Sequence, residues 1–158
     1  MTDIEKVNIL VKEGEGLTVE FKEHFTPRID EDIVAFSNTR GGVILLGVRD
    51  EQTVGGETLT SDMKARINSV ARNCNPPVQV KIKQIQDVVL IEVPQGEEKP
   101  YGCGSGYFRR LAGVLFFAKD PRRLIIQAQM TLIAFKGLGC RCCQRWVNHA
   151  SLVNRQAD

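Results

Sequence analysis

Three acidic residues in the first third of the chain are candidates for holding a divalent metal ion. Glu15 and Glu20 flank an alternating segment, and Asp50 follows a strongly apolar run. Carboxylate oxygens are preferred ligands of Mg²⁺ and Mn²⁺, and such an ion can activate water beside a phosphate. An extended chain would separate Glu15 from Glu20 by roughly 16 Å, so they could share an ion only if the chain bends at Gly14 or Gly16. The alternative is that all three are ordinary acids at strand ends and turns.

A second candidate site lies at the end of a predicted helix, in the sequence Asn38-Thr39-Arg40-Gly41-Gly42. Glycine allows a backbone to approach a phosphate closely, and the side chains of Asn38, Thr39 and Arg40 could contact a nucleic-acid backbone. A helix C-cap also favours glycine, which explains one of the two glycines without any ligand. Both interpretations stay open on the sequence alone.

Basic and aromatic residues occur together further along the chain, in two segments that could bind a polyanion. They are Lys99 and Tyr101 in the first segment and Tyr107, Phe108, Arg109 and Arg110 in the second. Rings of this kind stack on bases while Lys and Arg bind phosphates, and Lys22, beside the candidate metal ligands, adds a further cation. The alternative is that the second segment is an edge strand protected by its charges.

The cysteines indicate neither a disulfide framework nor a complete zinc site. There are five, an odd number, and Cys140 with Cys143 forms one Cys-x-x-Cys pair near His149. A structural zinc site needs four ligands, and Cys74 and Cys103 are distant in the sequence. The sequence also contains no G-x-x-x-x-G-K-S/T loop for ATP. We therefore expect no cofactor other than Mg²⁺ or Mn²⁺ at the three acids.

The composition is that of a folded protein with unevenly distributed charge. Of the 158 residues, 42% are hydrophobic and 25% charged, which excludes a fully disordered chain. Residues 1–60 carry six Lys and Arg against twelve Asp and Glu, whereas residues 61–158 carry fifteen against seven. The apolar runs are far shorter than the roughly 20 residues that cross a bilayer, and the N-terminus lacks the features of a secretion signal. We expect a cytoplasmic protein that does not contact membranes.

Periodicity predicts a mixed sheet with helices packed on it. Alternating or fully apolar runs indicate strands, and apolar residues three or four apart indicate helices. The order strand, helix, strand, helix, hairpin is typical of an α+β or α/β layered fold. The predicted elements are a strand at 17–21, a helix from about Glu31 to Asn38, a strand at 43–48, a helix capped by Thr60 or Ser61, a hairpin at 78–82 and 88–93, and an edge strand at 107–110.

Several of these motifs resemble the Schlafen-type AlbA domain, over about residues 8–110. The resemblance implies DNA binding, as part of bacterial transcriptional regulators or of ATP-dependent DNA helicases related to the recombination helicase RecG. In animal Schlafen proteins the same domain can act as an RNA endonuclease with three acids, which the resemblance carries onto Glu15, Glu20 and Asp50. The matching motifs are Glu15-x4-Glu20-Phe-Lys22, Phe36-Ser-Asn-Thr-Arg-Gly-Gly42, Asn75-Pro-Pro, Lys99-Pro-Tyr101 and Tyr107-Phe-Arg109.

The resemblance divides the chain into three parts. Residues 1–110 correspond to the AlbA domain itself. Residues 111–137 are similar to a segment that, in longer relatives, follows the domain only after a helical stretch. Residues 138–158 match nothing in the family, and we expect them to form a disordered tail.

The residues and the resemblance together favour a nucleic-acid-binding module that grips phosphates, with DNA and RNA both open as partners. One alternative is a divalent-metal-dependent endoribonuclease that uses the three acids. The other is a non-catalytic regulatory or assembly domain, which would associate with copies of itself. The candidate phosphate contacts are Lys22, Arg40, Lys99, Arg109 and Arg110.

Overall fold

A computed structural model describes residues 2–111 and 114–123. Residues 1–121 form one compact unit, and the helices and strands named below all lie in it. The predicted tail at 138–158, its cysteine cluster, and residues 124–137 of the predicted downstream segment lie outside the described residues. The elements are α1 (Asp3–Glu13), β1 (Val19–Lys22), α2 (Ile29–Ser37), β2 (Gly42–Leu46), α3 (Ser61–Arg72), β3 (Lys81–Ile85), β4 (Val88–Val93), β5 (Gly102–Cys103), β6 (Gly106–Leu111) and β7 (Val114–Ala118).

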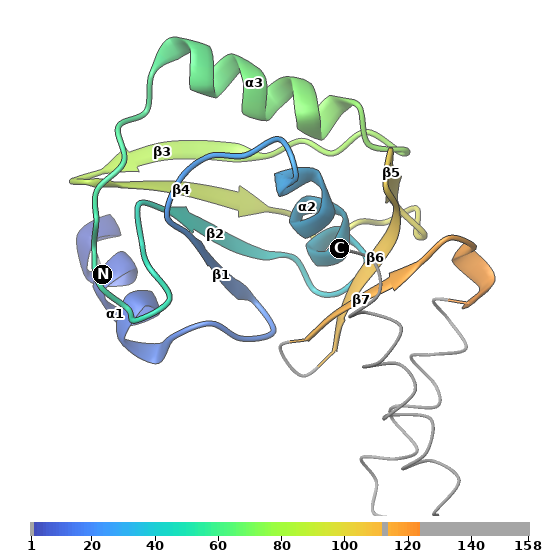
Figure 1. Cartoon of the computed structure of the whole chain (residues 1–158), viewed down its shortest axis with the longest axis horizontal. Helices are drawn as coiled ribbons and strands as arrows, with labels where there is room; N and C mark the ends of the chain where they lie inside the picture. Colours follow the sequence, from blue (N-terminus) through green and yellow to red (C-terminus); the bar gives the residue numbers. More distant parts are fainter. Residues whose placement is uncertain (1, 112–113, 124–158) are drawn as a thin grey trace, which may run out of the picture. The chain divides into compact units, whose positions relative to one another are not determined.

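The larger sheet has four strands in the order β1-β2-β4-β3. β1 and β2 are parallel, with Glu20 opposite Ile44, and α2 lies in the crossover between them, as a parallel pair requires. β4 runs antiparallel to both β2 and β3. The sheet is therefore mixed, and helices pack on it (Figure 1). This arrangement confirms the predicted α+β class.

Helices cover both faces of β2, and its residues alternate between two apolar clusters. Ile44 and Leu46 pack with Ile33 of α2 in one cluster, whereas Leu45 packs with Val7 of α1 in the other. The side chains of Ile44, Leu45 and Leu46 are all fully buried. A strand that is buried on both faces must be apolar throughout, which explains the continuous apolar run seen in the sequence.

The N-terminal helix α1 is absent from the elements predicted above. Only Val7 of this helix is buried, so its apolar stripe is too short to stand out by periodicity. A capping box starts the helix: the Thr2 hydroxyl accepts from the N–H of Glu5 at 3.2 Å, and the Glu5 carboxylate accepts from the N–H of Thr2 at 2.7 Å. The spacing Thr-x-x-Glu was the available signal.

Among the described residues, the smaller sheet has three strands in the order β5-β6-β7, and it packs against α2 through β6. The prediction of an edge strand at 107–110 is wrong, because β7 pairs with β6 and places it at the centre of this sheet. Phe108 and Arg110 are buried on the side that faces α2, whereas Tyr107 and Arg109 are partly exposed. Within the described part of the chain, no helix has the length and apolar character needed to cross a membrane.

Candidate functional site

A charged cleft of about 450 Å³ opens where β1, α2 and β6 meet. β1 contributes Glu20 and Lys22, α2 contributes Glu31 and Asp32, and β6 contributes Arg110. The cleft combines carboxylates with cations, so it can bind a charged ligand or transfer protons. The remaining lining residues are Glu15, Thr26, Arg28 and Leu115.

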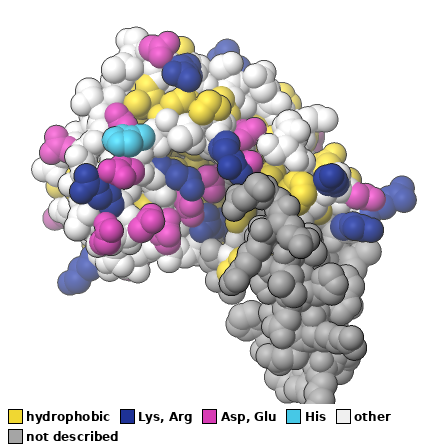
Figure 2. All heavy atoms as spheres, viewed as in Figure 1, with side chains coloured by type: hydrophobic (Ala, Val, Ile, Leu, Met, Phe, Trp, Pro, Cys, Tyr) yellow, Lys and Arg dark blue, Asp and Glu magenta, His cyan; other side chains and the backbone are white. Residues whose placement is uncertain are grey.

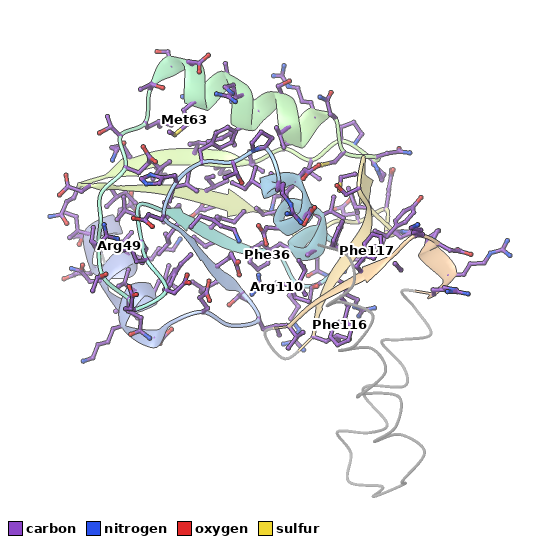
Figure 3. The ribbon with its side chains drawn as sticks, viewed as in Figure 1. Phe36, Arg49, Met63, Arg110, Phe116 and Phe117 are labelled. Carbon is purple, nitrogen blue, oxygen red and sulfur yellow. The ribbon has the colours of Figure 1, made fainter. Side chains whose placement is uncertain are left out.

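Four of these side chains form a compact cluster of ion pairs. Glu20 contacts Lys22 Nζ through Oε1 and Arg110 Nη1 through Oε2, each at 2.6 Å. Asp32 lies 3.4 Å from Lys22 Nζ and 3.9 Å from Arg110 Nη1. Arg110 also stacks over Phe36, 4.9 Å from the ring centroid (Figure 3). A buried charge is costly unless it is paired, so Lys22 and Arg110, two of the predicted phosphate contacts, are engaged inside the protein.

The environment of this cluster shifts the pKa values of two of its members. Burial raises the pKa of Asp32 to about 6, with a further contribution from the negative charge of Glu20, although Lys22 and Arg110 oppose the shift. Burial alone would lower the pKa of Lys22, but Asp32 and Glu20 outweigh it, so that pKa is raised. A carboxyl that titrates near pH 6 beside a second carboxylate is suited to general acid–base chemistry.

Glu15 reaches the cleft because the chain turns back before β1. Between the two acids, the N–H of Gly16 donates to the carbonyl of Val19 at 3.0 Å, which closes a turn. Glu15 Oε1 then accepts a hydrogen bond from the N–H of Phe21 at 2.9 Å. The bend that the sequence requires is therefore present, and Glu15 and Glu20 line the same cleft.

Asp50 does not line this cleft. It is exposed in the turn that follows β2, next to Arg49, which pairs with Glu23 at 2.9 Å. Within residues 2–111 and 114–123, no group of three or more His, Cys, Asp and Glu side chains is placed to hold one metal ion. The structure brings two of the three predicted acids together, and a metal site formed by all three stays a prediction.

Asn38 and Tyr101, two other predicted contacts, connect loops inside the fold. The side chains are buried, with only 4% of Asn38 and 8% of Tyr101 exposed. Asn38 Nδ2 donates to the carbonyls of Tyr101 and Phe108, both at 2.8 Å, and its Oδ1 accepts from the N–H of Tyr101 at 2.7 Å. Thr39 Oγ1 donates to the carbonyl of Ala35 at 2.7 Å and accepts from the N–H of Arg110 on β6 at 3.2 Å. These polar groups hold the smaller sheet against α2.

Exposed cations gather beyond the C-terminal end of α2. Lys99 Nζ donates to the carbonyl of Thr39 at 2.7 Å, and the next residue, Arg40, is exposed. Burial, and then the positive charge of Arg109, lower the pKa of Lys99, so these two cations lie close together. Elsewhere on the face drawn in Figure 2, Lys and Arg are interleaved with Asp and Glu. Arg40, Lys99 and Arg109 are named the cationic group below.

Glu31 and Asp32 are absent from the site residues predicted above. The helix was predicted to begin near Glu31, but α2 begins at Ile29, and its N-cap, Arg28, makes no side-chain capping bond. Asp32 follows Ile29 by three residues and precedes Phe36 by four, which places it on the apolar face of the helix. An acid at that spacing was the signal for an internal ion pair.

Comparisons with known proteins identify the family and the fold. A model of the family described as Schlafen, AlbA_2 matches residues 15–114. Among the solved structures that match is the DIP2311 protein from Corynebacterium diphtheriae, with a TM-score of 0.50 and 17% sequence identity. The similarity covers 65% of this chain and 22% of that chain, and at this identity it concerns the fold alone. No curated protein matches the chain at a significant level.

Proposed function

The chain belongs to the Schlafen AlbA_2 family, and from this premise we propose that it binds nucleic acid through the phosphate backbone. The family is nucleic-acid-related, which gives the class of partner. The contacts proposed for this chain are those of the cationic group. Lys and Arg that neutralise phosphates supply most of the sequence-independent affinity of such proteins.

The observation that carries this proposal is that Lys99 bonds to the backbone at the end of α2, next to Arg40 in the sequence, and lies close enough to Arg109 for their charges to interact. Arg40 follows α2, Lys99 lies in the loop before β5, and Arg109 is on β6. In the part of the chain that the structure describes, none of the three forms an ion pair with Asp or Glu. Their charges are therefore available to phosphates, in contrast to those of Lys22 and Arg110, which are compensated internally.

Binding of labelled DNA and RNA across a salt series tests the proposal. We expect affinity to fall steeply with salt, and Arg40→Glu or Lys99→Glu to weaken binding and reduce the slope of log K against log salt by about one each. Lys64→Glu is the matched control, because Lys64 is exposed on α3, and it should behave like the unmodified chain. Absent or salt-independent binding would overturn the proposal.

The cleft favours a second candidate function, a metal-dependent endoribonuclease. Glu15 and Glu20 line it together with Glu31 and Asp32, and carboxylates of this kind could hold Mg²⁺ or Mn²⁺ and activate water. Such an enzyme would cleave structured RNA only with the metal present and would stop on addition of a chelator. Asp50, the third acid predicted from the sequence, lies outside the cleft, and the variant Asp50→Asn tests whether the activity needs it.

The variants for this test follow from the contacts of each acid. Glu15→Gln should abolish cleavage with little effect on folding, because the Glu15 side chain lines the cleft and makes one backbone hydrogen bond. Glu20 is less suitable because it also holds Arg110. Glu23→Gln, an exposed acid outside the cleft, should leave cleavage unchanged. Metal-independent cleavage, or full activity of Glu15→Gln, would contradict this function.

The wider context is also a proposal. The resemblance to RecG-related helicases and transcriptional regulators would make this domain the part of a longer protein that binds DNA. A non-catalytic assembly domain is the remaining alternative, and it would be favoured by dimers that bind neither DNA nor RNA at low salt.

A further inference from the structure

The smaller sheet has one face that packs on α2 and a second face that carries rings and a cation. Antiparallel partners lie on the same face, and Arg109 of β6 is directly opposite Phe116 of β7. Tyr107, two residues before Arg109, shares that face because side chains alternate along a strand. Figure 3 shows Phe116 and its neighbour Phe117 on opposite sides of β7. The residues Tyr107, Arg109 and Phe116 are named the outer face.

Glycine on β5 fixes the position of the Tyr107 ring. Tyr107 is directly opposite Gly102, and a Cβ at Gly102 would lie 2.8 Å from Cε1 and 3.1 Å from Cδ1 of the ring. The ring therefore lies against the backbone of β5, in the space that a side chain would fill. One side of the ring is supported by the sheet, and the residue remains partly exposed.

Phe116 is partly exposed near Tyr107. Diagonal neighbours across an antiparallel pair are about 7–8 Å apart, and Tyr107 and Phe116 have this relationship because their direct partners are Ala118 and Arg109. Among the described residues, the ring contact of this sheet is between Phe108 and Phe117, and Tyr107 and Phe116 do not stack on each other. Each of them can receive a separate planar group.

Cationic side chains lie beside the two rings. Arg109 lies directly opposite Phe116, and among the described residues its buried Nε has no hydrogen-bond partner. Lys99 lies close enough to Arg109 for their charges to interact, and Lys99 Nζ donates to the carbonyl of Thr39, the residue that precedes Arg40. The cationic group therefore extends to the outer face of the smaller sheet.

We propose that the outer face binds single-stranded nucleic acid, with Tyr107 and Phe116 stacking on two unpaired bases and Arg109 and Lys99 contacting the phosphates. Aromatic rings on a β-strand with cations beside them are suited to binding single-stranded nucleic acid. Every base has a planar face, so stacking tolerates any sequence. A duplex keeps its bases stacked on one another and offers these rings only its backbone. The inference rests on the proposed nucleic-acid binding and adds to it the kind of strand and the residues that recognise it.

The first test compares three ligands on the unmodified full chain at fixed low salt. They are an oligo-dT of about 15 nucleotides, an abasic oligomer with the same number of phosphates, and a duplex of the same length. We expect the oligo-dT to bind at least about fivefold more tightly than the abasic oligomer, which is the equivalent of about 1 kcal/mol for one stacked base. The duplex should bind no more tightly than the abasic oligomer.

The second test changes the rings while keeping apolar bulk. Phe116→Leu and Tyr107→Leu should each lower the affinity for oligo-dT at least about fivefold and leave the abasic oligomer unaffected. Phe117→Leu is the matched control, because this ring belongs to the same strand but contacts Phe108, with ring centroids 5.2 Å apart. Circular dichroism verifies that the variants fold. The first test, which compares the three ligands, uses only the unmodified chain and so does not depend on the folding of any variant.

The outcomes separate this inference from the proposed function. Equal affinity for oligo-dT and the abasic oligomer, or unchanged affinity in both Phe116→Leu and Tyr107→Leu, would overturn the stacking face while leaving phosphate binding intact. Tighter binding of the duplex than of oligo-dT would overturn the single-strand preference. If no ligand binds even at low salt, the proposed function fails as well, and the inference fails with it.

Discussion

Arg110 on β6 forms an ion pair with Glu20 on β1, although the two residues are 90 positions apart in the sequence. Nη1 and Oε2 are 2.6 Å apart, and the Arg110 side chain is only 3% exposed. The pair joins the two sheets of the fold. Asp32 of α2 lies close to both cations of the cluster, Lys22 and Arg110. Glu20 therefore contributes to folding whether or not it also binds a ligand.

Removing this carboxylate should destabilise the protein. Glu20→Ala leaves the buried guanidinium without its shortest ion pair, and we expect a loss of roughly 3 kcal/mol in the free energy of unfolding, measured by urea denaturation. Glu23→Ala is the control: its pair with Arg49 is exposed, so it should cost about 0–1 kcal/mol. Equal unfolding midpoints for the two variants would contradict the structural role of Glu20.

The stability of the protein should depend on pH through Asp32. Its pKa rises from 3.8 to about 6 on folding, so the folded state binds this proton more tightly than the unfolded state. The corresponding stability is fully present below about pH 4 and is lost as pH rises through about 6, by up to about 3 kcal/mol. The measurement is the unfolding free energy at several pH values, compared between the unmodified chain and Asp32→Asn.

Asp32→Asn cannot ionise and therefore isolates this effect from that of the other acids. The variant should gain stability relative to the unmodified chain as pH rises from about 4 to about 6, whatever the offset caused by losing the contacts with Lys22 and Arg110. A constant difference over this range, or one with the opposite slope, would show that the Asp32 pKa is not raised in the folded protein.

The elements of the larger sheet could be predicted because their signals are local. The apolar run at 43–48 contains most of the strand β2 at Gly42–Leu46, and Thr60 caps α3 as expected, its side chain accepting from the N–H of Met63. The predicted hairpin is also confirmed, with its second strand at Val88–Val93 as expected, but its first strand is Lys81–Ile85 instead of 78–82. The periodicity of the sequence shows which residues point to the same face of a strand. Where β3 begins is decided by its hydrogen bonds to β4, which the sequence pattern does not show.

The cleft could be predicted only in part, because it depends on contacts between distant segments. The acids Glu15 and Glu20 and the bend between them are visible in the sequence. The burial of Arg110 is not visible, since it requires β6 to be a central strand, and that requires pairing with β7. Two adjacent arginines look alike in the sequence, but alternation along β6 turns Arg110 towards α2 and Arg109 away from it.

The burial of Asn38, a predicted nucleic-acid contact, could not be seen in the sequence either. It leads to a third prediction. Asn38→Ala leaves backbone groups of Tyr101 and Phe108 without their partners, and we expect a loss of about 3 kcal/mol in unfolding free energy. Asn68→Ala, the control on α3, removes one hydrogen bond to the carbonyl of Lys64 near the surface and should have little effect. Similar thermal stability of the two variants would mean that Asn38 is free to serve a ligand.

The structure requires both glycines after α2, whereas helix capping explained only one of them. Gly41 has a φ of 74° and donates its N–H to the carbonyl of Phe36 at 2.9 Å. Gly42 begins β2, and a Cβ there would lie 2.5 Å from two ring carbons of Phe36 and 2.7 Å from the carbonyl oxygen of Thr18. Because that ring is fully buried, it has no open space into which it can move.

Gly42→Ala should therefore lower the free energy of unfolding by about 1–3 kcal/mol, the usual cost of overpacking a core. Gly104→Ala provides the control, because a Cβ at Gly104 has no atom within 4 Å, and its effect should stay within about 0.5 kcal/mol. Urea denaturation of both variants decides between the two interpretations of the motif. If Gly42→Ala keeps the stability of the unmodified chain but loses affinity for DNA and RNA, the second glycine serves the approach of a phosphate and not the packing of Phe36.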